Sequence, residues 1–196
     1  MRKSGEQRRE EIVQAVIHLA AEKDGGQITA QAIADRVGIA QPTVFRHFKT
    51  RDRILEAVIE WIARQLLGVV GSVAAGTGPA DERLRQLLEQ QLSFIAKHRG
   101  LPRLLFSERL HQENTHLKRS VGRIMEAYSN TVADLLRDGV ASGVFRPDLD
   151  ADETARLILA MIQGLVMRWS IHDFDFELPN ESASLWRLLE PALLKR

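Results

Sequence analysis

The stretch from Ile28 to Ile54 constrains the fold of this 196-residue chain more than any other segment. It contains two short helical patterns of apolar residues, one on each side of Gly38. Thr29 is a suitable N-cap for the first helix, and Gly38 suits the left-handed position at which such a helix ends. Pro42 falls at the start of the second helix, where its missing N–H costs nothing. Two short helices joined by a glycine turn predict a helix-turn-helix.

The second helix of this motif carries an unusual mixture of polar and basic side chains. Between Gln41 and Lys49 the chain combines Gln, Thr, Arg, His and Lys. Val44 and Phe48 are expected in the core of a small domain, because at helical spacing they face away from the polar positions. A hairpin that served only for packing would not need these polar groups together on one short helix. The mixture therefore favours a nucleic-acid-binding helix over a hairpin that is merely basic.

The same residues resemble the DNA-binding domain of the TetR family of bacterial transcriptional regulators. They are Ile28-Thr29, Ile33-Ala34, the run from Val37 to Lys49, and Arg51, and they follow one predicted N-terminal helix. Helical apolar spacing along the chain predicts an all-α fold of about nine helices, which agrees with the resemblance. The resemblance also implies an N-terminal three-helix helix-turn-helix domain, expected at residues 1–50, and a larger helical effector-binding and dimerisation domain at residues 51–196.

The resemblance further implies which side chains contact double-stranded DNA. In a helix-turn-helix the second helix enters the major groove, where glutamine can bond adenine and basic side chains can neutralise phosphates. The implied contacts of the recognition helix are Gln41, Pro42, Phe45 and His47, with Gln31 in the preceding helix as a base contact. Phosphate contacts are implied for Thr43, Lys49 and Arg51, and Thr29 and Arg46 complete the expected set.

Two positions depart from the family pattern. Phe45 stands where the family more often has tyrosine, so a hydroxyl-to-phosphate bond is lost and the ring has packing as its alternative role. Ala40 replaces the usual serine or threonine before the recognition helix. Without that side chain the helix loses one capping hydrogen bond, which costs about 1 kcal/mol.

The charge of the chain is divided unevenly along the sequence. The net charge is only +1, but residues 1–53 hold 10 Lys and Arg against 7 Asp and Glu, whereas the remainder holds 17 against 19. Five cationic or titratable groups, Arg46, His47, Lys49, Arg51 and Arg53, fall within eight positions. Such a cluster can neutralise phosphates and release counterions, although charged helix faces are often simply solvated.

Several classes of protein have no support in the sequence. There is no cysteine, which excludes disulfides and thiolate metal sites. No apolar run reaches about eighteen residues and the N-terminus is charged, so we expect no membrane partner and a cytoplasmic location. The histidines within residues 111–116 and 172–177 lack the i, i+4 pair of a good chelate, and no catalytic or cofactor-binding motif appears. We therefore expect no enzyme, no metal and no cofactor.

The rest of the chain has helical apolar spacing and no strand-like alternation. Glycines at positions 68–78 are expected to end the fourth helix and form a loop, and Gly139, Gly143 and Pro147 are expected to mark another. Asp150, three residues before Glu153, predicts a helix start. The expected helices lie at about residues 5–23, 30–37, 41–48, 50–67, 84–95, 102–110, 114–138, 150–171 and 182–195.

The larger domain is expected to hold the effector site and the dimer interface. The bulky side chains that could line a pocket for an unknown small molecule are Phe94, Phe106, Met125, Tyr128, Met161 and Trp169, although each alone is more typical of plain core. Residues 157–171 are apolar on several sides, so one side could cover the pocket and the other a second subunit. An ordinary central core helix is the alternative.

These observations predict a homodimeric, ligand-responsive repressor that leaves a palindromic operator when its effector binds. Two recognition helices related by a two-fold axis suit such an operator, and in the family the last two helices form the dimer. A chromosome-organising or division-linked DNA-binding protein without an inducer is the alternative. The segment from His98 to Leu101 and the closing helices bear a loose likeness to such TetR-like proteins.

Overall fold

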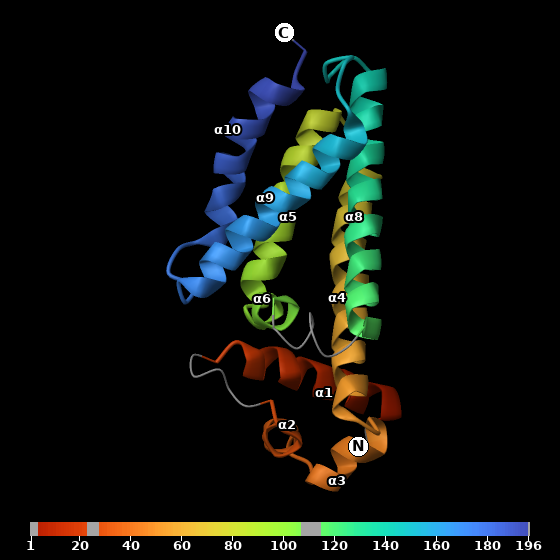
Figure 1. Ribbon diagram of the computed structural model, residues 1–196, viewed down its shortest axis with the longest axis vertical. Helices are drawn as coiled ribbons and strands as arrows, with labels where there is room; N and C mark the ends of the chain where they lie inside the picture. Colours follow the sequence, from red (N-terminus) through yellow and green to blue (C-terminus); the bar gives the residue numbers. More distant parts are fainter. Residues whose placement is uncertain (1–3, 23–27, 107–114, 196) are drawn as a thin grey trace. The chain divides into compact units, whose positions relative to one another are not determined.

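The computed structural model describes residues 4–22, 28–106 and 115–195, and within them the chain is all-α, as predicted (Figure 1). A single isolated bridge between Phe145 and Leu194 is the only β feature of these residues. The helices are α1 (Gly5–Ala20), α2 (Ala30–Val37), α3 (Gln41–His47), α4 (Arg51–Ala74), α5 (Ala80–Lys97), α6 (Gly100–Leu105), α8 (Thr115–Ala141), α9 (Ala151–Ile171) and α10 (Glu181–Leu193), with a 3-10 helix η1 (Leu178–Asn180) before α10.

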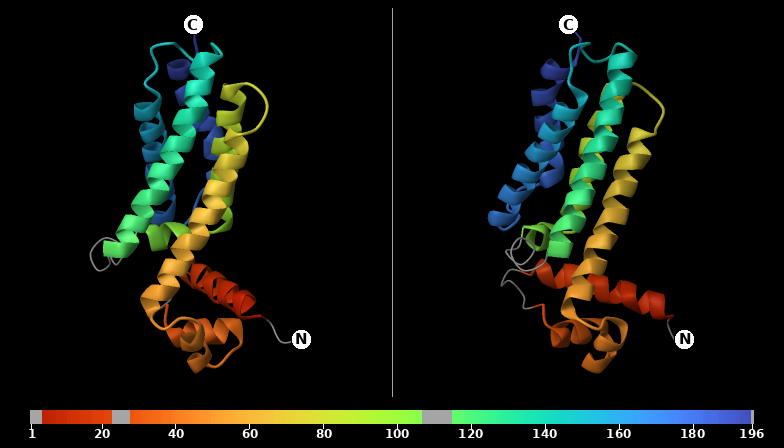
Figure 2. Two further views of the ribbon diagram at one scale, coloured as in Figure 1. Left: turned by 90° about the vertical axis from the view of Figure 1, so that its right-hand side faces the viewer. Right: turned by 45° about the vertical axis from the view of Figure 1, so that its right-hand side comes forward.

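The chain packs as two compact units. The first comprises residues 1–63 and 98–121, and the second comprises residues 64–97 and 122–196. Helices α4 and α8 each begin in the first unit and end in the second, and Figure 2 follows both from two further sides. The predicted division into a DNA-binding domain (residues 1–50) and an effector-binding and dimerisation domain (residues 51–196) is a division by function, not by packing. It stays a prediction.

The helix-turn-helix forms for the local reasons expected from its sequence. The Thr29 hydroxyl accepts a 3.1 Å hydrogen bond from the Ala32 amide and caps α2. Gly38 ends α2 in the left-handed region, at φ 72° and ψ 42°, which glycine adopts without a Cβ penalty. Pro42 lies in the first turn of α3, and Ala40 provides no side-chain cap. These four sequence predictions are confirmed.

The glycine-rich end of α4 differs from the expectation. The helix does not stop at Gly68 but continues to Ala74, so only the segment after it forms a loop. Each glycine costs a helix about 1 kcal/mol, and the buried side chains of Val70 and Val73 offset that cost. Arg83 then donates a 2.6 Å hydrogen bond to the Ala74 carbonyl and satisfies the end of the helix.

Gly139 was also expected in a loop, and this prediction is wrong. It lies inside α8, which continues to Ala141, and the left-handed turn falls at Gly143. A Cβ at Gly139 would come within 2.1 Å of Cδ2 of Phe145 and 2.9 Å of Cβ of Ala80. Gly139 therefore permits a close approach between packed segments instead of a turn.

The second unit has an apolar core around one buried polar pair. Its helices are the later part of α4, α5, most of α8, α9 and α10. The hydroxyl of Tyr128 donates a 2.6 Å hydrogen bond to Oε1 of Gln91, which joins α8 to α5. Asp150 caps α9 by accepting a 2.9 Å hydrogen bond from the Glu153 amide, as expected from the sequence.

Among the described residues, α4 is long and apolar enough to cross a membrane by length and composition alone. Buried core helices of soluble proteins pass the same test, and one such helix is weak evidence. In the first unit Ile54, Val58 and Trp61 of α4 are buried. Their burial is the ordinary reason for an apolar stripe on a helix of a globular domain.

Candidate nucleic-acid interface and associated sites

Helix α3 has one buried side and one exposed polar side. Val44 is fully buried and Phe48 is 2% exposed, which confirms that both belong to the core of the first unit. On the other side Gln41, Pro42 and Arg46 are exposed, and Phe45 is 44% exposed. Thr43 and His47 are half-buried at the edge of this face. The face presents hydrogen-bonding, aromatic and cationic groups on a single short helix.

Two predicted contacts on α2 already have intramolecular partners. Thr29 is exposed, but its hydroxyl accepts the capping hydrogen bond of α2. Gln31 is also exposed, and its amide donates a 2.7 Å hydrogen bond to Oδ1 of Asp35, one turn further along. This bond orients the Gln31 amide and uses one of its two N–H donors, so its second N–H and its oxygen remain available for a base contact.

The basic cluster after α3 is only partly available for phosphates. Arg46, Lys49 and Arg51 are exposed. Arg53 instead forms a 2.7 Å ion pair with Glu56, so its charge is locally balanced. All four cations of this cluster lie on the surface around the C-terminal end of α3 and the start of α4, and the charge of Arg53 is already paired there.

His47 lies in a positively charged environment. Partial burial lowers its pKa below the ordinary value of 6.5, and the nearby charges of Arg46, Arg8 and Arg9 lower it further. Near neutral pH the imidazole is therefore neutral in the free protein. A DNA phosphate beside it would add negative charge and favour the protonated form.

The structure also brings to α3 a side chain that sequence reasoning did not select. Arg9 of α1 donates a 2.6 Å hydrogen bond to the main-chain carbonyl of His47. Its guanidinium carbon lies 4.1 Å from the centre of the Phe48 ring. Arg9 and His47 are 38 residues apart, so no local sequence pattern predicts their contact.

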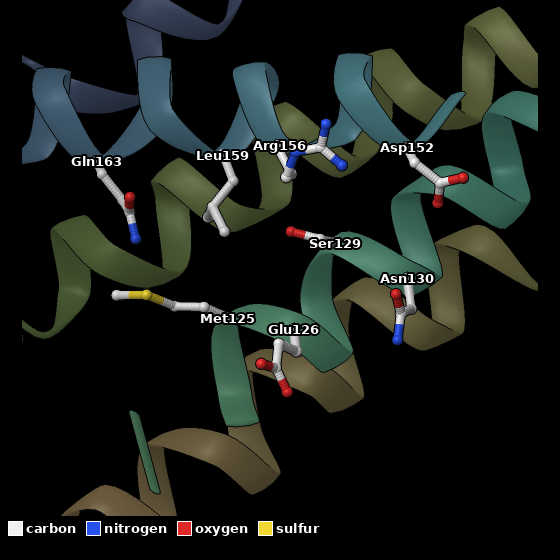
Figure 3. A pocket seen from close by; sticks show the side chains of 8 residues that line it. All are labelled: Met125, Glu126, Ser129, Asn130, Asp152, Arg156, Leu159 and Gln163. Atoms are coloured by element: carbon white, nitrogen blue, oxygen red, sulfur yellow. The ribbon is translucent and has the colours of Figure 1, made fainter. Parts of the chain in front are cut away.

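A cleft in the second unit lies between α8 and α9 and is shown in Figure 3. Its volume is about 310 Å³. Eight side chains line it: Met125, Glu126, Ser129, Asn130, Asp152, Arg156, Leu159 and Gln163. In Figure 3 the side chains of Leu159 and Gln163 extend from α9 toward the α8 side that carries Met125. At its other end, Asp152 accepts hydrogen bonds of 2.6 Å from Arg137.

Only Met125 of the six predicted effector contacts lines this cleft. Tyr128 and Trp169 are each 1% exposed, and Trp169 donates a 2.8 Å hydrogen bond to the Phe176 carbonyl. Phe94, Phe106 and Met161 are half-buried. Six of the eight lining residues are polar or charged, whereas the pocket expected from the sequence was lined by bulky apolar groups.

The last two helices expose large apolar side chains. Leu157, Met167 and Ile171 of α9 are between 47% and 68% exposed, and Leu188 of α10 is 64% exposed. On α9 they share one face with Gly164, where an added Cβ would meet nothing within 4 Å. An exposed apolar face with a small residue at its centre suits close packing against another helix.

No group of three or more His, Asp or Glu side chains that could hold a metal ion occurs within residues 4–22, 28–106 and 115–195. Of the histidine-containing segments noted in the sequence, His111 and Glu113 lie outside the described residues. His116 has a different neighbour, since its Nδ1 lies 3.6 Å from Oε1 of Glu56.

Helix α3 packs one side into the core of the first unit and exposes a polar side, which is the arrangement of a helix-turn-helix protein of the DNA-binding class. Residues 12–58 match the family described as "Bacterial regulatory proteins, tetR family". Residues 77–170 match the one described as "Tetracyclin repressor-like, C-terminal domain". The chain therefore belongs to the TetR family, and it is a DNA-binding regulator of that family.

Known relatives resemble the chain over nearly its whole length. The nucleoid occlusion factor SlmA of Vibrio vulnificus is 27% identical over 184 residues, which cover 93% of both chains. The transcriptional regulator FadR of Bacillus subtilis, solved with stearoyl-CoA, has a TM-score of 0.78 at 24% identity and covers 92% of this chain and 96% of its own. A transcriptional regulator of Saccharomonospora viridis, solved with choline, has a TM-score of 0.83 at 22% identity and covers 97% and 100%. These two structures share the fold.

Proposed function

We propose that the chain is a homodimeric repressor that reads a palindromic operator with α3 and leaves it when a small molecule binds. The observation that carries this proposal is the division of α3 into a buried side and an exposed polar side. Gln41 lies at the N-terminal end of that exposed side, where a recognition helix meets base edges. Pro42, Thr43, Phe45, Arg46 and His47 would complete the contact surface, with Thr29, Gln31, Lys49 and Arg51 at its edges.

The exposed apolar face of α9 and α10 supports dimerisation. Leu157, Met167, Ile171 and Leu188 would otherwise remain in water, and burying such side chains contributes about 25 cal/mol per Å² of apolar surface. A two-fold interface uses the same patch on both subunits, and two helices from each would form a four-helix bundle. Such a dimer presents two recognition helices to the two halves of a palindrome.

The cleft between α8 and α9 supports an effector site in the second unit. Its volume of about 310 Å³ is at the lower end of the range for small-molecule sites. Arg156 and Glu126 offer charges of both signs, and Met125 and Leu159 offer apolar contacts. Occupation of this site is proposed to shift the separation of the recognition helices, and couplings of this kind are typically worth about 1–3 kcal/mol.

A regulator that reads chromosomal DNA works in the bacterial cytoplasm, and the relatives in the family support that location. Binding and release of DNA require no bond-making step. We therefore assign the chain no enzymatic activity and no cofactor.

A second candidate function is supported by the likeness to SlmA. That relative is named a nucleoid occlusion factor, and the similarity extends through both halves of the chain. On this alternative the protein would occupy many chromosomal sites, organise DNA or act in division, and need no inducer. The exposed face of α3 would serve either role, because both require sequence-specific DNA binding.

Genome-wide mapping of the bound DNA distinguishes the two candidates. A local repressor should occupy one or a few operators, and a chromosome-organising protein should occupy many dispersed sites. A Gln41→Ala variant should lose sequence-specific occupancy. A matched Gln86→Ala variant, altered at an exposed position of α5, should keep it. An intact dimer that protects no specific sequence on any enriched DNA would refute both candidates.

A further inference from the structure

Helix α3 depends on its neighbours to keep its position. It has seven residues, no side-chain N-cap, and a following residue, Phe48, with extended backbone at φ −135° and ψ 108°. Isolated helices shorter than about 12 residues are marginal in water, so the helix cannot be stable alone. Its last carbonyl groups also require hydrogen-bond donors from outside the helix. A partner at the C-terminal end therefore decides how well the orientation of α3 is fixed.

Arg9 supplies that partner through two simultaneous contacts. One guanidinium nitrogen donates a 2.6 Å hydrogen bond to the carbonyl of His47, the last residue of α3. The guanidinium carbon lies 4.1 Å from the centre of the Phe48 ring, and Phe48 is itself buried. One side chain of α1 thus holds the final helical carbonyl and the first side chain after the helix.

The chemistry of both contacts requires arginine. A cation at a helix C-terminus interacts favourably with the negative end of the helix dipole. The planar guanidinium can stack on a ring while it donates in its own plane, whereas a lysine ammonium is a compact point charge and cannot do both in the same way. The neighbouring Arg8 makes neither contact, because it pairs with Glu11 at 2.8 Å.

We propose that Arg9 is a positioning residue that fixes the orientation of α3 and thereby sets the discrimination between specific and non-specific DNA. The proposal rests on the proposed function of α3 as recognition helix. A small rotation of α3 would weaken its hydrogen bonds to base edges, because these bonds depend on geometry. Attraction to phosphates depends mainly on charge and would persist. Arg9 should therefore affect specificity more than general DNA affinity.

The experiment compares wild type with Arg9→Lys, Arg9→Gln and Arg8→Gln. Arg8→Gln is the matched control, because it removes one positive charge from the adjacent position of α1. Like Arg9, Arg8 also lowers the pKa of His47 by its charge. The probe is the duplex that the wild-type protein enriches most from a randomised library. A shuffled duplex of the same composition measures non-specific binding. Both dissociation constants are measured across a salt titration.

For Arg9→Lys we expect about tenfold weaker binding to the enriched duplex, equivalent to about 1.4 kcal/mol. Binding to the shuffled duplex and the salt slope should stay unchanged, because the charge is kept. Arg9→Gln should lose the same discrimination, and Arg8→Gln should keep the wild-type ratio of the two constants. Hydrogen exchange of the Phe48 amide, which is bonded to the Val44 carbonyl, should accelerate in both Arg9 variants.

Other outcomes would overturn the assignment. Equal losses in Arg8→Gln and Arg9→Gln, with the salt slope reduced by about 0.9 in each, would show ordinary phosphate contacts. An unchanged ratio of the two dissociation constants in Arg9→Lys would show that the contacts of Arg9 with His47 and Phe48 have no influence on recognition. Parallel loss of both kinds of binding, with faster exchange throughout the first unit, would show a role in folding only. Failure of the wild-type protein to enrich any duplex would instead refute the proposed function itself.

Discussion

Replacing Tyr128 by phenylalanine should destabilise the second unit, because Tyr128 forms a buried polar pair in its core. Its hydroxyl donates a 2.6 Å hydrogen bond to Oε1 of Gln91. The two residues are 1% and 2% exposed, so water does not replace a lost partner easily. Tyr128→Phe preserves the ring and its packing but removes the only donor that this structure gives to the Gln91 oxygen among the described residues.

The expected loss in the free energy of unfolding is about 2 kcal/mol, since a buried polar group left without its partner costs about 1–3 kcal/mol. For a chain of this length, each kcal/mol lowers the melting temperature by about 2–4 °C. The double variant Tyr128→Phe with Gln91→Leu should recover most of the loss, because both polar groups are then absent. The difference between single and double variants isolates the pair.

Tyr128 also predicts an alkaline change in stability. Burial raises the pKa of its hydroxyl above the ordinary value of 10.0. The folded state therefore keeps a proton that the unfolded state loses near pH 10. The stabilisation is fully present below about pH 10 and is lost as the pH rises further. In Tyr128→Phe this part of the alkaline decline should disappear.

Urea denaturation at pH 7, followed by far-UV circular dichroism, measures the free energies, and a repeat at pH 10.5 measures the alkaline change. The single variants, the double variant and wild type should share one m-value if the comparison is sound. A loss below 0.5 kcal/mol, or no recovery in the double variant, would refute the reasoning about the buried pair. Unchanged stability with an altered response to effector would place Tyr128 in the ligand site instead.

Substitutions at three other places give independent checks. DNA affinity should rise as the pH falls, because a neighbouring phosphate favours the protonated form of His47, whose pKa is lowered below 6.5 in the free protein by burial and by nearby arginines. His47→Gln should flatten the pH profile measured by fluorescence anisotropy. Ile171→Glu should convert the proposed dimer to monomer in sedimentation velocity, because it places two carboxylates in an apolar interface; a dimer that persists would exclude this face. Gly139→Ala should lower the free energy of unfolding by about 1–3 kcal/mol, since its Cβ would meet Phe145 at 2.1 Å. In Gly122→Ala, a variant of the same helix, the added Cβ meets nothing within 4 Å, and the free energy of unfolding should rise by about 0.5–1 kcal/mol. A Gly139→Ala variant more stable than Gly122→Ala would contradict this account.

The helix-turn-helix was predictable because local chemistry determines it. Thr29, Gly38 and Pro42 each act through the backbone of their own helix, so their roles follow from their positions in the sequence. The buried positions Val44 and Phe48 follow from the helical period. Phe45 illustrates the limit of this reasoning, since packing and DNA contact were both open for it. Its exposure shows that it is not required in the core of the first unit.

Glycine was misinterpreted where tertiary packing overrode local preference. Gly68 and Gly71 lie inside α4, although a glycine-rich sequence favours a helix end. Buried valines and the cap from Arg83 hold that part of the helix, and neither is visible in the local pattern. Gly139 is fixed by a contact with Phe145, which returns from beyond the next turn. Such contacts become known only when the helices are placed in space.

The cleft between α8 and α9 was harder to predict than the exposed face of α3 for the same reason. Bulky apolar side chains such as Tyr128 and Trp169 fill the core because their burial contributes most to stability. A cleft between two helices is instead lined by residues at the flanks of each apolar stripe, and here these include Glu126, Asn130 and Arg156. Polar flanking residues look like ordinary solvated positions in a sequence. The volume left between α8 and α9 is set by how the two helices cross, which helical periodicity alone does not specify.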